Sequence, residues 1–398
     1  MLGPLLAALL LSGPALANGQ NTHVWITLQA AQQVQDPELR ALLADHQNAL
    51  INGGMFPDGG YAVNHPYGEA GHWEGVHDPF RDWLRENQDP QDVPELVAFY
   101  MGMASHGMAD QSFDAFYFSE SRVRDADDGW AEGESFDEAS DVIWTAVQGG
   151  SPVPERQVPT QMPGIYEEVG IEVDPDTLDD GQKLVISALE LVALLGTNEA
   201  KVAEYQALFP WGGANLDAPL PGAPADEARI VAAYLDHLWV DLQEGDQPLA
   251  VVATVPEQGS YGWPTDATDV GSRLGLVFSK AMEQGQVLPE SLSLVSQDGD
   301  RIAVDTNLFY GSGSHVLHVV PQENLASDAD YTLSLSAGVQ ARDGRTLPQD
   351  FSFSFSTRAP PVDTQDTGVA EQGCGGCGGG SGGWVILAML ALFTRREP

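Results

Sequence analysis

The histidines of this chain are concentrated near its beginning. Of the nine histidines in 398 residues, six lie before residue 110. One of them, His106, precedes Asp110 by four residues in an apolar segment that predicts a helix. Residues four apart on a helix share a face, so this pair can offer a ring nitrogen and a carboxylate to one metal ion. Taken alone, the pair also fits a hydrogen-bonded helix face without a metal.

Three other segments supply ligands of the same kinds. Asp58 stands in the Gly-rich stretch Phe56–Tyr61, which predicts a turn. His72 follows shortly afterwards, between a glycine and a tryptophan, and His23 lies in Asn21-Thr22-His23. Since no cysteine occurs before Cys374, a metal in the body of the chain needs His, Asp and Glu ligands.

Together these residues resemble the zinc-dependent phospholipase C family, which shares its fold with fungal single-strand nucleases. The resemblance extends over residues 18–247. It implies metal ligands at five matching positions: His23, Asp58, His72, His106 and Asp110. The last four would form one zinc site. Asp110 would bridge to a second metal, which His23 and the α-amine of Asn18 would also hold.

The chain departs from the family pattern after Asp110. The family has two further histidines, the second in a His-x-x-x-Glu helix, whereas residues 111–234 contain none. Acidic residues stand there instead: Asp114 follows by one turn, and Glu134 and Glu138 have the spacing of the missing motif. Asp137 and Asp141 form an alternative pair. Because oxygen ligands suit harder cations, we expect one to three Zn²⁺ ions, with Ca²⁺ as an alternative at the acidic positions.

The resemblance implies metal-assisted hydrolysis of a phosphodiester. Bound zinc lowers the pKa of a water molecule and neutralises charge on phosphate oxygens. Asp58 is expected to orient or deprotonate the attacking water. The prediction is therefore phospholipase C-type cleavage of a phospholipid. Two alternatives stay open: a non-catalytic surface or adhesion protein that retains the fold, and a nuclease on the same fold.

The charge of the chain narrows the choice of substrate. Lys and Arg total 17 against 58 Asp and Glu, a formal net charge of −41. Such a protein repels polyanions. We therefore expect no nucleic-acid partner and favour a neutral or zwitterionic phospholipid, or a small phosphodiester.

Helices must position these residues. Apolar, helix-forming patterns cover Pro94–Ala109, Lys183–Gly196 and Ala225–Leu242, and residues 18–247 are therefore expected to form an all-α domain. Acidic, Pro- and Gly-rich stretches at 152–180 and 211–224 predict loops.

From Leu249 the hydrophobic pattern changes to a period of two. Short alternating runs bounded by turn residues predict an antiparallel sandwich over residues 248–358. The phrases Leu276–Met282 and Phe353–Thr357 resemble bacterial Ig-like domains, which usually serve as spacers or adhesion modules. The expected fold class is multidomain: an all-α zinc-phospholipase-like domain plus an all-β Ig-like sandwich.

We expect targeting signals at both ends of the chain. Residues 1–17 are apolar, end in Ala-Leu-Ala and predict a cleaved signal peptide. A Gly/Cys-rich linker, 359–383, precedes an apolar tail, 384–398, that contains an Arg pair. This order resembles myxobacterial-type C-terminal sorting tails and implies export, with the tail held in the membrane or processed there. The alternative is a degenerate membrane anchor with a cysteine pair that forms a disulfide or redox couple.

Overall fold

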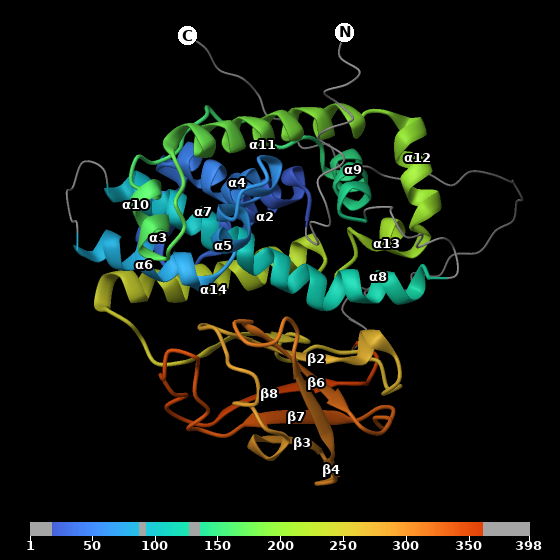
Figure 1. Ribbon diagram of the computed structural model, residues 1–398. Coiled ribbons are helices and arrows are strands. Elements are labelled where there is room, and N and C mark those ends of the chain that lie inside the picture. Colours follow the sequence, from blue (N-terminus) through green and yellow to red (C-terminus); the bar gives the residue numbers. More distant parts are fainter. Residues whose placement is uncertain (1–17, 87–92, 127–135, 361–398) are drawn as a thin grey trace, which may run out of the picture. The chain divides into compact units, whose positions relative to one another are not determined.

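A computed structural model describes residues 18–86, 93–126 and 136–360 (Figure 1). The predicted signal peptide, Glu134, most of the linker and the apolar tail lie outside these residues. Up to Ala359 the described residues belong to one compact unit.

The first part of the described chain is helical, as predicted. Its α-helices are α2 Gln20–Gln33, α3 Pro37–Asp45, α4 Gln47–Ala62, α5 Tyr67–Gly71, α6 Glu74–Glu86, α7 Val93–Ser112, α8 Ser119–Arg124, α9 Phe136–Gln148, α10 Met162–Glu168, α11 Pro175–Leu195, α12 Glu199–Leu208, α13 Pro210–Asn215 and α14 Pro224–Glu244. A π-helix, Phe113–Phe118, continues α7. The two stretches predicted as loops are partly helical, since they contain α10, the start of α11 and most of α13.

The core of the helical part is built around α7. Every residue of this helix from Leu96 to Ser112 is buried, so its polar residues, His106 and Asp110 among them, lie in the interior together with its apolar ones. Helix α4 packs between α7 and α11, and α14 packs on α2 and α7. In Figure 1, α2, α4 and α7 accordingly lie between α11 and α14.

Glycines allow α4 and α7 to approach closely. A Cβ atom on Gly53 of α4 would lie 2.0 Å from the carbonyl oxygen of Phe99 on α7. The prediction of a turn around Asp58 is wrong, because this Gly-rich segment lies within α4. Its glycines serve close packing of helix against helix and loop rather than chain reversal.

The second part is a pair of antiparallel sheets, which confirms the predicted fold class. The strands are β1 Val251–Val255, β2 Leu274–Phe278, β3 Leu292–Ser296, β4 Arg301–Ile302, β5 Val304–Leu308, β6 Val316–Pro321, β7 Asp330–Leu335 and β8 Phe351–Ser356. Their orders are β1-β2-β6-β5 and β4-β3-β7-β8. Strands β4 and β5 were not predicted, because β4 has only two residues and the three central residues of β5 are polar.

Buried polar contacts join the helices to the strands within the compact unit. The Gln111 side chain accepts a hydrogen bond from the backbone N–H of His315 at 2.8 Å. Lys280 follows β2 and its ammonium lies 3.1 Å from the carboxylate of Asp241 on α14, with both side chains almost fully buried. These contacts tie the strands to α7 and α14. None of the described helices has the length and apolar character needed to cross a bilayer.

Candidate metal centre

Five of the predicted ligands come together in the interior of the helical part. His23 lies on α2, Asp58 on α4, and His106 and Asp110 on α7, while His72 directly follows α5. All are buried except Asp58, which is partly exposed. Helix packing therefore brings residues from four different segments to one point.

Short distances separate the ring nitrogens of this cluster from its carboxylate oxygens. The Nε2 atom of His72 lies 3.3 Å from Asp110 Oδ2 and 3.6 Å from Asp58 Oδ1. The Nε2 atom of His106 lies 3.5 Å from Asp110 Oδ2 and also 3.6 Å from Asp58 Oδ1. Two imidazoles thus face the same two carboxylates.

The other nitrogen of each ring forms a hydrogen bond with the backbone. Nδ1 of His72 lies 2.7 Å from the carbonyl oxygen of Gly68, and Nδ1 of His106 lies 2.8 Å from that of Gly54. A carbonyl only accepts, so both Nδ1 atoms must carry hydrogen. In the neutral rings, Nε2 is then a bare lone pair, which is the form that binds a metal.

The two Nε2 atoms of His72 and His106 lie 3.0 Å apart. Two lone pairs at this distance repel each other unless a cation lies beside them or one ring takes up a proton. The nearby carboxylates of Asp58 and Asp110 favour positive charge at this point. A positive charge between the two rings would therefore remove this repulsion.

Gly107 allows His72 to reach this position. A Cβ atom at residue 107 would lie 2.2 Å from the backbone oxygen of His72. Any larger residue at position 107 would push the segment that carries His72 away from α7.

His23 extends the cluster on the side of α2. Its ring stacks on that of His106 with centroids 3.8 Å apart, and its Nε2 lies 3.0 Å from Asp110 Oδ1. Burial alone would lower the pKa of His23, but the Asp110 carboxylate outweighs burial and raises the pKa above its ordinary value. The Nδ1 atom of His23 is buried and has no hydrogen-bond partner in the described part of the chain.

Asp58 is held as a carboxylate by its surroundings. Burial would raise its pKa, yet His106 and His72 outweigh burial and hold the pKa well below its usual range. The side-chain amide of Gln20 donates a hydrogen bond to Oδ2 of Asp58, while Oδ1 has no hydrogen-bond partner among the residues that the structure describes. An ionised carboxylate with one free oxygen is suited to bind a cation.

The donor atoms fit a divalent metal. Among the described residues, two sets of three have ligand atoms within 4.8 Å of one another. These are His23, Asp58 and His106, and His72, His106 and Asp110. Imidazole nitrogens combined with carboxylate oxygens are a typical ligand set for Zn²⁺. Buried atoms of His23 and Asp58 have no hydrogen-bond partner among the described residues, which fits a role as metal ligands.

Other predicted ligands lie outside these two sets. The side-chain amide of Asn18 donates to Glu227 at 2.6 Å. Tyr310 donates its hydroxyl to Asp114, and Tyr205 donates its hydroxyl to Glu138. Burial raises the pKa of Asp114 well above its ordinary value, which the hydrogen bond from Tyr310 opposes.

Three polar residues near the cluster have roles that the sequence did not indicate. Gln20 contacts Asp58, and Glu227 contacts Asn18. Asp141, predicted only as part of an alternative ligand pair, instead accepts hydrogen bonds from the backbone N–H and the hydroxyl of Thr22, each at 2.7 Å. It therefore anchors the start of α2, next to His23. The sequence offered one signal for these roles, the position of Gln20 two residues before Thr22-His23.

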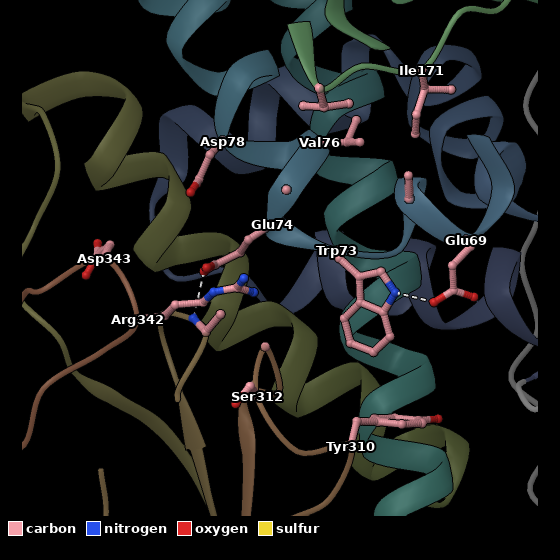
Figure 2. A pocket seen from close by; sticks show the side chains of 15 residues that line it. Glu69, Trp73, Glu74, Val76, Asp78, Ile171, Tyr310, Ser312, Arg342 and Asp343 are labelled. Carbon is pink, nitrogen blue, oxygen red and sulfur yellow. Dashed lines mark hydrogen bonds between the residues drawn. The ribbon is translucent and has the colours of Figure 1, made fainter. Parts of the chain in front are cut away.

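A pocket of about 850 Å³ is lined by residues of the helical part and of the part that contains the strands (Figure 2). Its walls include Glu69 and Trp73 from the helical part and Tyr310 from the loop after β5. Figure 2 shows the indole of Trp73 pointing toward both Glu69 and Tyr310. The pocket thus adjoins the residue that follows His72.

Comparison with known proteins supports both parts of the chain separately. Residues 22–113 match the family model "Zinc dependent phospholipase C", and residues 245–357 match "Bacterial Ig-like domain". The first match contains all five clustered residues.

Curated relatives match a limited part of the chain. Phosphatidylinositol-glycan-specific phospholipase D of Rattus norvegicus is 34% identical over 124 residues, which cover 28% of this chain and 15% of the relative. The same enzyme of Mus musculus is 32% identical over 108 residues, 24% of this chain and 13% of the relative. The chain therefore spans only a small share of the length of these relatives.

Solved structures add no argument about fold. The crystal structure of the S-layer protein rSbsC(31-844) aligns with 81% of this chain and 46% of its own length, at 11% identity and a TM-score of 0.23. A TM-score this low supports no statement about the chain. Residues 22–113, which carry a buried His/Asp cluster that could hold a metal ion, are thus similar to the zinc dependent phospholipase C family, and residues 245–357 are similar to bacterial Ig-like domains.

Proposed function

We propose that this protein is a zinc-dependent hydrolase that cleaves phospholipids as phospholipase C does. The observation that carries the proposal is the pair of Nε2 atoms on His72 and His106, 3.0 Å apart and both facing Asp58 and Asp110. Buried groups of this kind rarely serve stability alone, because replacing them with apolar residues is often neutral or stabilising. A buried cluster of ionisable side chains that does not add stability is expected to serve a chemical function.

Each residue of the centre has a proposed role. Asp58, His72, His106 and Asp110 would hold one Zn²⁺, and His23 with Asp110 would hold a second. Bound zinc supplies an acidified water and neutralises charge on phosphate oxygens. Asp58 would bind the metal through Oδ1 and orient the attacking water from there, while Gln20 fixes its other oxygen.

The relatives support the class of substrate. The curated relatives are named as phospholipases specific for phosphatidylinositol-glycan, and the matched family is named for phospholipase C. Together with the net charge of −41, which disfavours polyanions, these names support a phospholipid over a nucleic acid. The acidic positions Asp114 and Glu138 remain proposed ligands of an additional Zn²⁺ or Ca²⁺ ion.

A hydrolysis assay tests the proposal. Purified full-length protein with added Zn²⁺ is incubated with phosphatidylcholine vesicles or with single-stranded DNA, and the release of phosphocholine or of nucleotides is measured. We expect phosphocholine release that falls at least about 100-fold in Asp110→Asn, and unchanged release in Asp45→Asn, an exposed control. Equal release by the wild type and Asp110→Asn would overturn the proposal. Cleavage of DNA alone would favour the nuclease alternative, and no turnover at all would favour the adhesion alternative.

We also propose that the protein is exported and held at the cell surface by its tail. The support is the sequence of residues 1–17 and of residues 359–398 alone. Mass spectrometry of the protein from its native cells should find Asn18 as the first residue. A mature chain that begins at Met1 would contradict this proposal.

A further inference from the structure

We propose that the Ig-like domain fixes the position of the proposed metal ligand Asp110, through its contacts with Gln111 and with the π-helix that follows α7. Gln111 acts through Asp110 and is therefore a positioning residue rather than a ligand. This inference rests on the metal centre of the proposed function. It makes the Ig-like domain a support of that centre rather than a spacer.

Asp110 is the residue whose position matters most in the cluster. Its Oδ1 atom lies 3.0 Å from Nε2 of His23, and its Oδ2 atom lies 3.3 Å from Nε2 of His72 and 3.5 Å from that of His106. The first two rings belong to segments other than α7. A small rotation or shift of the end of α7 would therefore change these distances, and metal sites tolerate errors of only about 0.5 Å in ligand position.

The end of α7 is not a regular helix terminus. The helix ends at Ser112, and the chain continues as the π-helix Phe113–Phe118. π-Helices are rare and are found frequently at functional sites. Because this backbone form is uncommon, contacts from outside the helix are needed to hold it here.

Gln111 contacts the Ig-like domain directly beside Asp110. Its side-chain oxygen accepts a hydrogen bond from the backbone N–H of His315 at 2.8 Å, and both residues are buried. A buried N–H needs a partner, so this part of the Ig-like domain depends on a side chain of α7. Consecutive residues of an α-helix point about 100° apart. Gln111 can thus contact the strands while Asp110 contacts the rings.

Two further contacts hold the π-helix. The hydroxyl of Tyr310, on the loop after β5, donates a hydrogen bond to the carboxylate of Asp114. Phe116 packs so closely on β2 that a Cβ atom on Gly275 would collide with its ring. Contacts at residues 111, 114 and 116 together restrict both rotation and translation of this segment.

These contacts do more than join the two parts of the chain. The buried pair of Lys280 and Asp241 also joins them, at α14. The contacts on α7 differ because they begin at the residue next to a proposed ligand. Loss of Gln111 should therefore lower the affinity of the centre for a metal, whereas loss of an ordinary packing contact should lower only the stability.

Metal binding by the full-length protein tests the inference without any substrate turnover. Zn²⁺ affinity is measured by competition with a chromogenic chelator, and the visible absorption spectrum of bound Co²⁺ reports the ligand geometry. We expect Gln111→Ala to bind Zn²⁺ at least about tenfold more weakly than the wild type and to change the Co²⁺ spectrum. Phe353→Leu is the control, since it alters a buried side chain of the other sheet and should change neither readout.

A second variant acts from the Ig-like domain. Gly275→Ala changes no residue of the helical part but displaces the ring of Phe116. It should also weaken Zn²⁺ binding and change the spectrum, and it decides the question where Gln111→Ala does not fold.

The outcomes separate this inference from the proposed function. Wild-type affinity and spectrum in Gln111→Ala, or a loss no greater than that in Phe353→Leu, would overturn the inference and leave the proposed function standing. Zn²⁺ affinity that depends on Gln111, in a protein that hydrolyses no phospholipid, would overturn the proposed function alone. A wild type that binds no zinc would overturn both.

Discussion

At the scale of single residues, the chemistry of the centre depends on which ring nitrogens carry hydrogen. The carbonyl groups of Gly68 and Gly54 hold the hydrogens of His72 and His106 on Nδ1 and leave both Nε2 atoms bare. Backbone carbonyls cannot change their role as acceptors, so this choice is built into the fold. The centre is prepared for a metal by main-chain atoms as much as by its ligands.

The first prediction concerns Asp58. Asp58→Asn keeps the shape of the side chain but removes its charge and its ability to take a proton. We expect the kcat for phosphatidylcholine to fall by about 10²–10⁴-fold. Steady-state kinetics at saturating Zn²⁺ measures the loss, with Asp45→Asn as the control. A kcat within a factor of two of the wild type would exclude a catalytic role for Asp58.

The second prediction concerns Gln20, which contacts Asp58 through its side-chain amide. Side chains that do not touch the metal but form hydrogen bonds to its ligands typically contribute about 10–100-fold in metal affinity or activity. We expect Gln20→Ala to weaken Zn²⁺ binding by about this factor, as measured by competition with a chromogenic chelator. Gln32→Ala lies on the same helix at an exposed position and should bind Zn²⁺ as the wild type does. Equal affinities of the two variants would show that Gln20 does not position Asp58.

At the scale of elements, the close contact of α4 with α7 fixes the separation of Asp58 from His106 and Asp110. That contact depends on Gly53, where a side chain would collide with the backbone of Phe99. Backbone atoms cannot move aside as a flexible side chain can. The glycine therefore sets both the stability of the helical core and the geometry of the centre.

The third prediction follows from this contact. Gly53→Ala should lower the free energy of unfolding by about 1–3 kcal/mol, although alanine is the better helix former. Gly164→Ala on α10 is the matched control, because no atom of the described residues lies within 4 Å of the added Cβ, and it should leave stability unchanged or raise it by up to about 1 kcal/mol. Urea denaturation measures both. Equal effects of the two substitutions would contradict the account of α4–α7 packing.

The sequence predicted the elements that have a strong period. Helix α7 and most of the strands were expected close to their observed bounds, because their apolar residues recur at the spacing of one element. The segment around Asp58 was predicted as a turn, since a sequence does not distinguish a glycine that bends the chain from one that lets helices touch. Strands β4 and β5 lack an apolar alternation, so only their pairing with neighbours defines them.

The site could be predicted only in part for a related reason. His23, Asp58, His72, His106 and Asp110 were found through spacing and resemblance, and the fold brings them together. Glu227 was missed, because the burial of an acidic residue on an amphipathic helix depends on what packs against it. Whether the acidic residues that replace the missing histidines bind a metal stays a prediction.

At the scale of the whole molecule, the junction between helices and strands contains buried ionisable groups. The carboxylate of Glu74 accepts a hydrogen bond from the backbone of Ala281 and lies 3.4 Å from Nε2 of His315. Burial, followed by the nearby Asp78, raises the pKa of Glu74 to about 8. The folded protein therefore keeps a proton on Glu74 that the unfolded chain releases near pH 4.5.

The fourth prediction is a pH dependence of stability with a defined sign. Because the folded pKa is raised, the contribution of Glu74 is fully present below about pH 4.5 and is lost as the pH rises through about 8. We expect Glu74→Gln to reduce the fall in unfolding free energy between pH 6 and pH 9. Urea denaturation across this range measures it, with the exposed Glu257→Gln as the control. A variant that loses stability as steeply as the wild type would show that Glu74 does not titrate at the junction.

The most direct test of the account is the zinc content of the purified full-length protein. After dialysis against Zn²⁺ and removal of free metal, elemental analysis should find at least one zinc ion per chain. His106→Ala should remove it, because both ligand sets include His106. No bound zinc in the wild type, or the same zinc content in His106→Ala, would contradict the central claim that this buried His/Asp cluster is a metal centre.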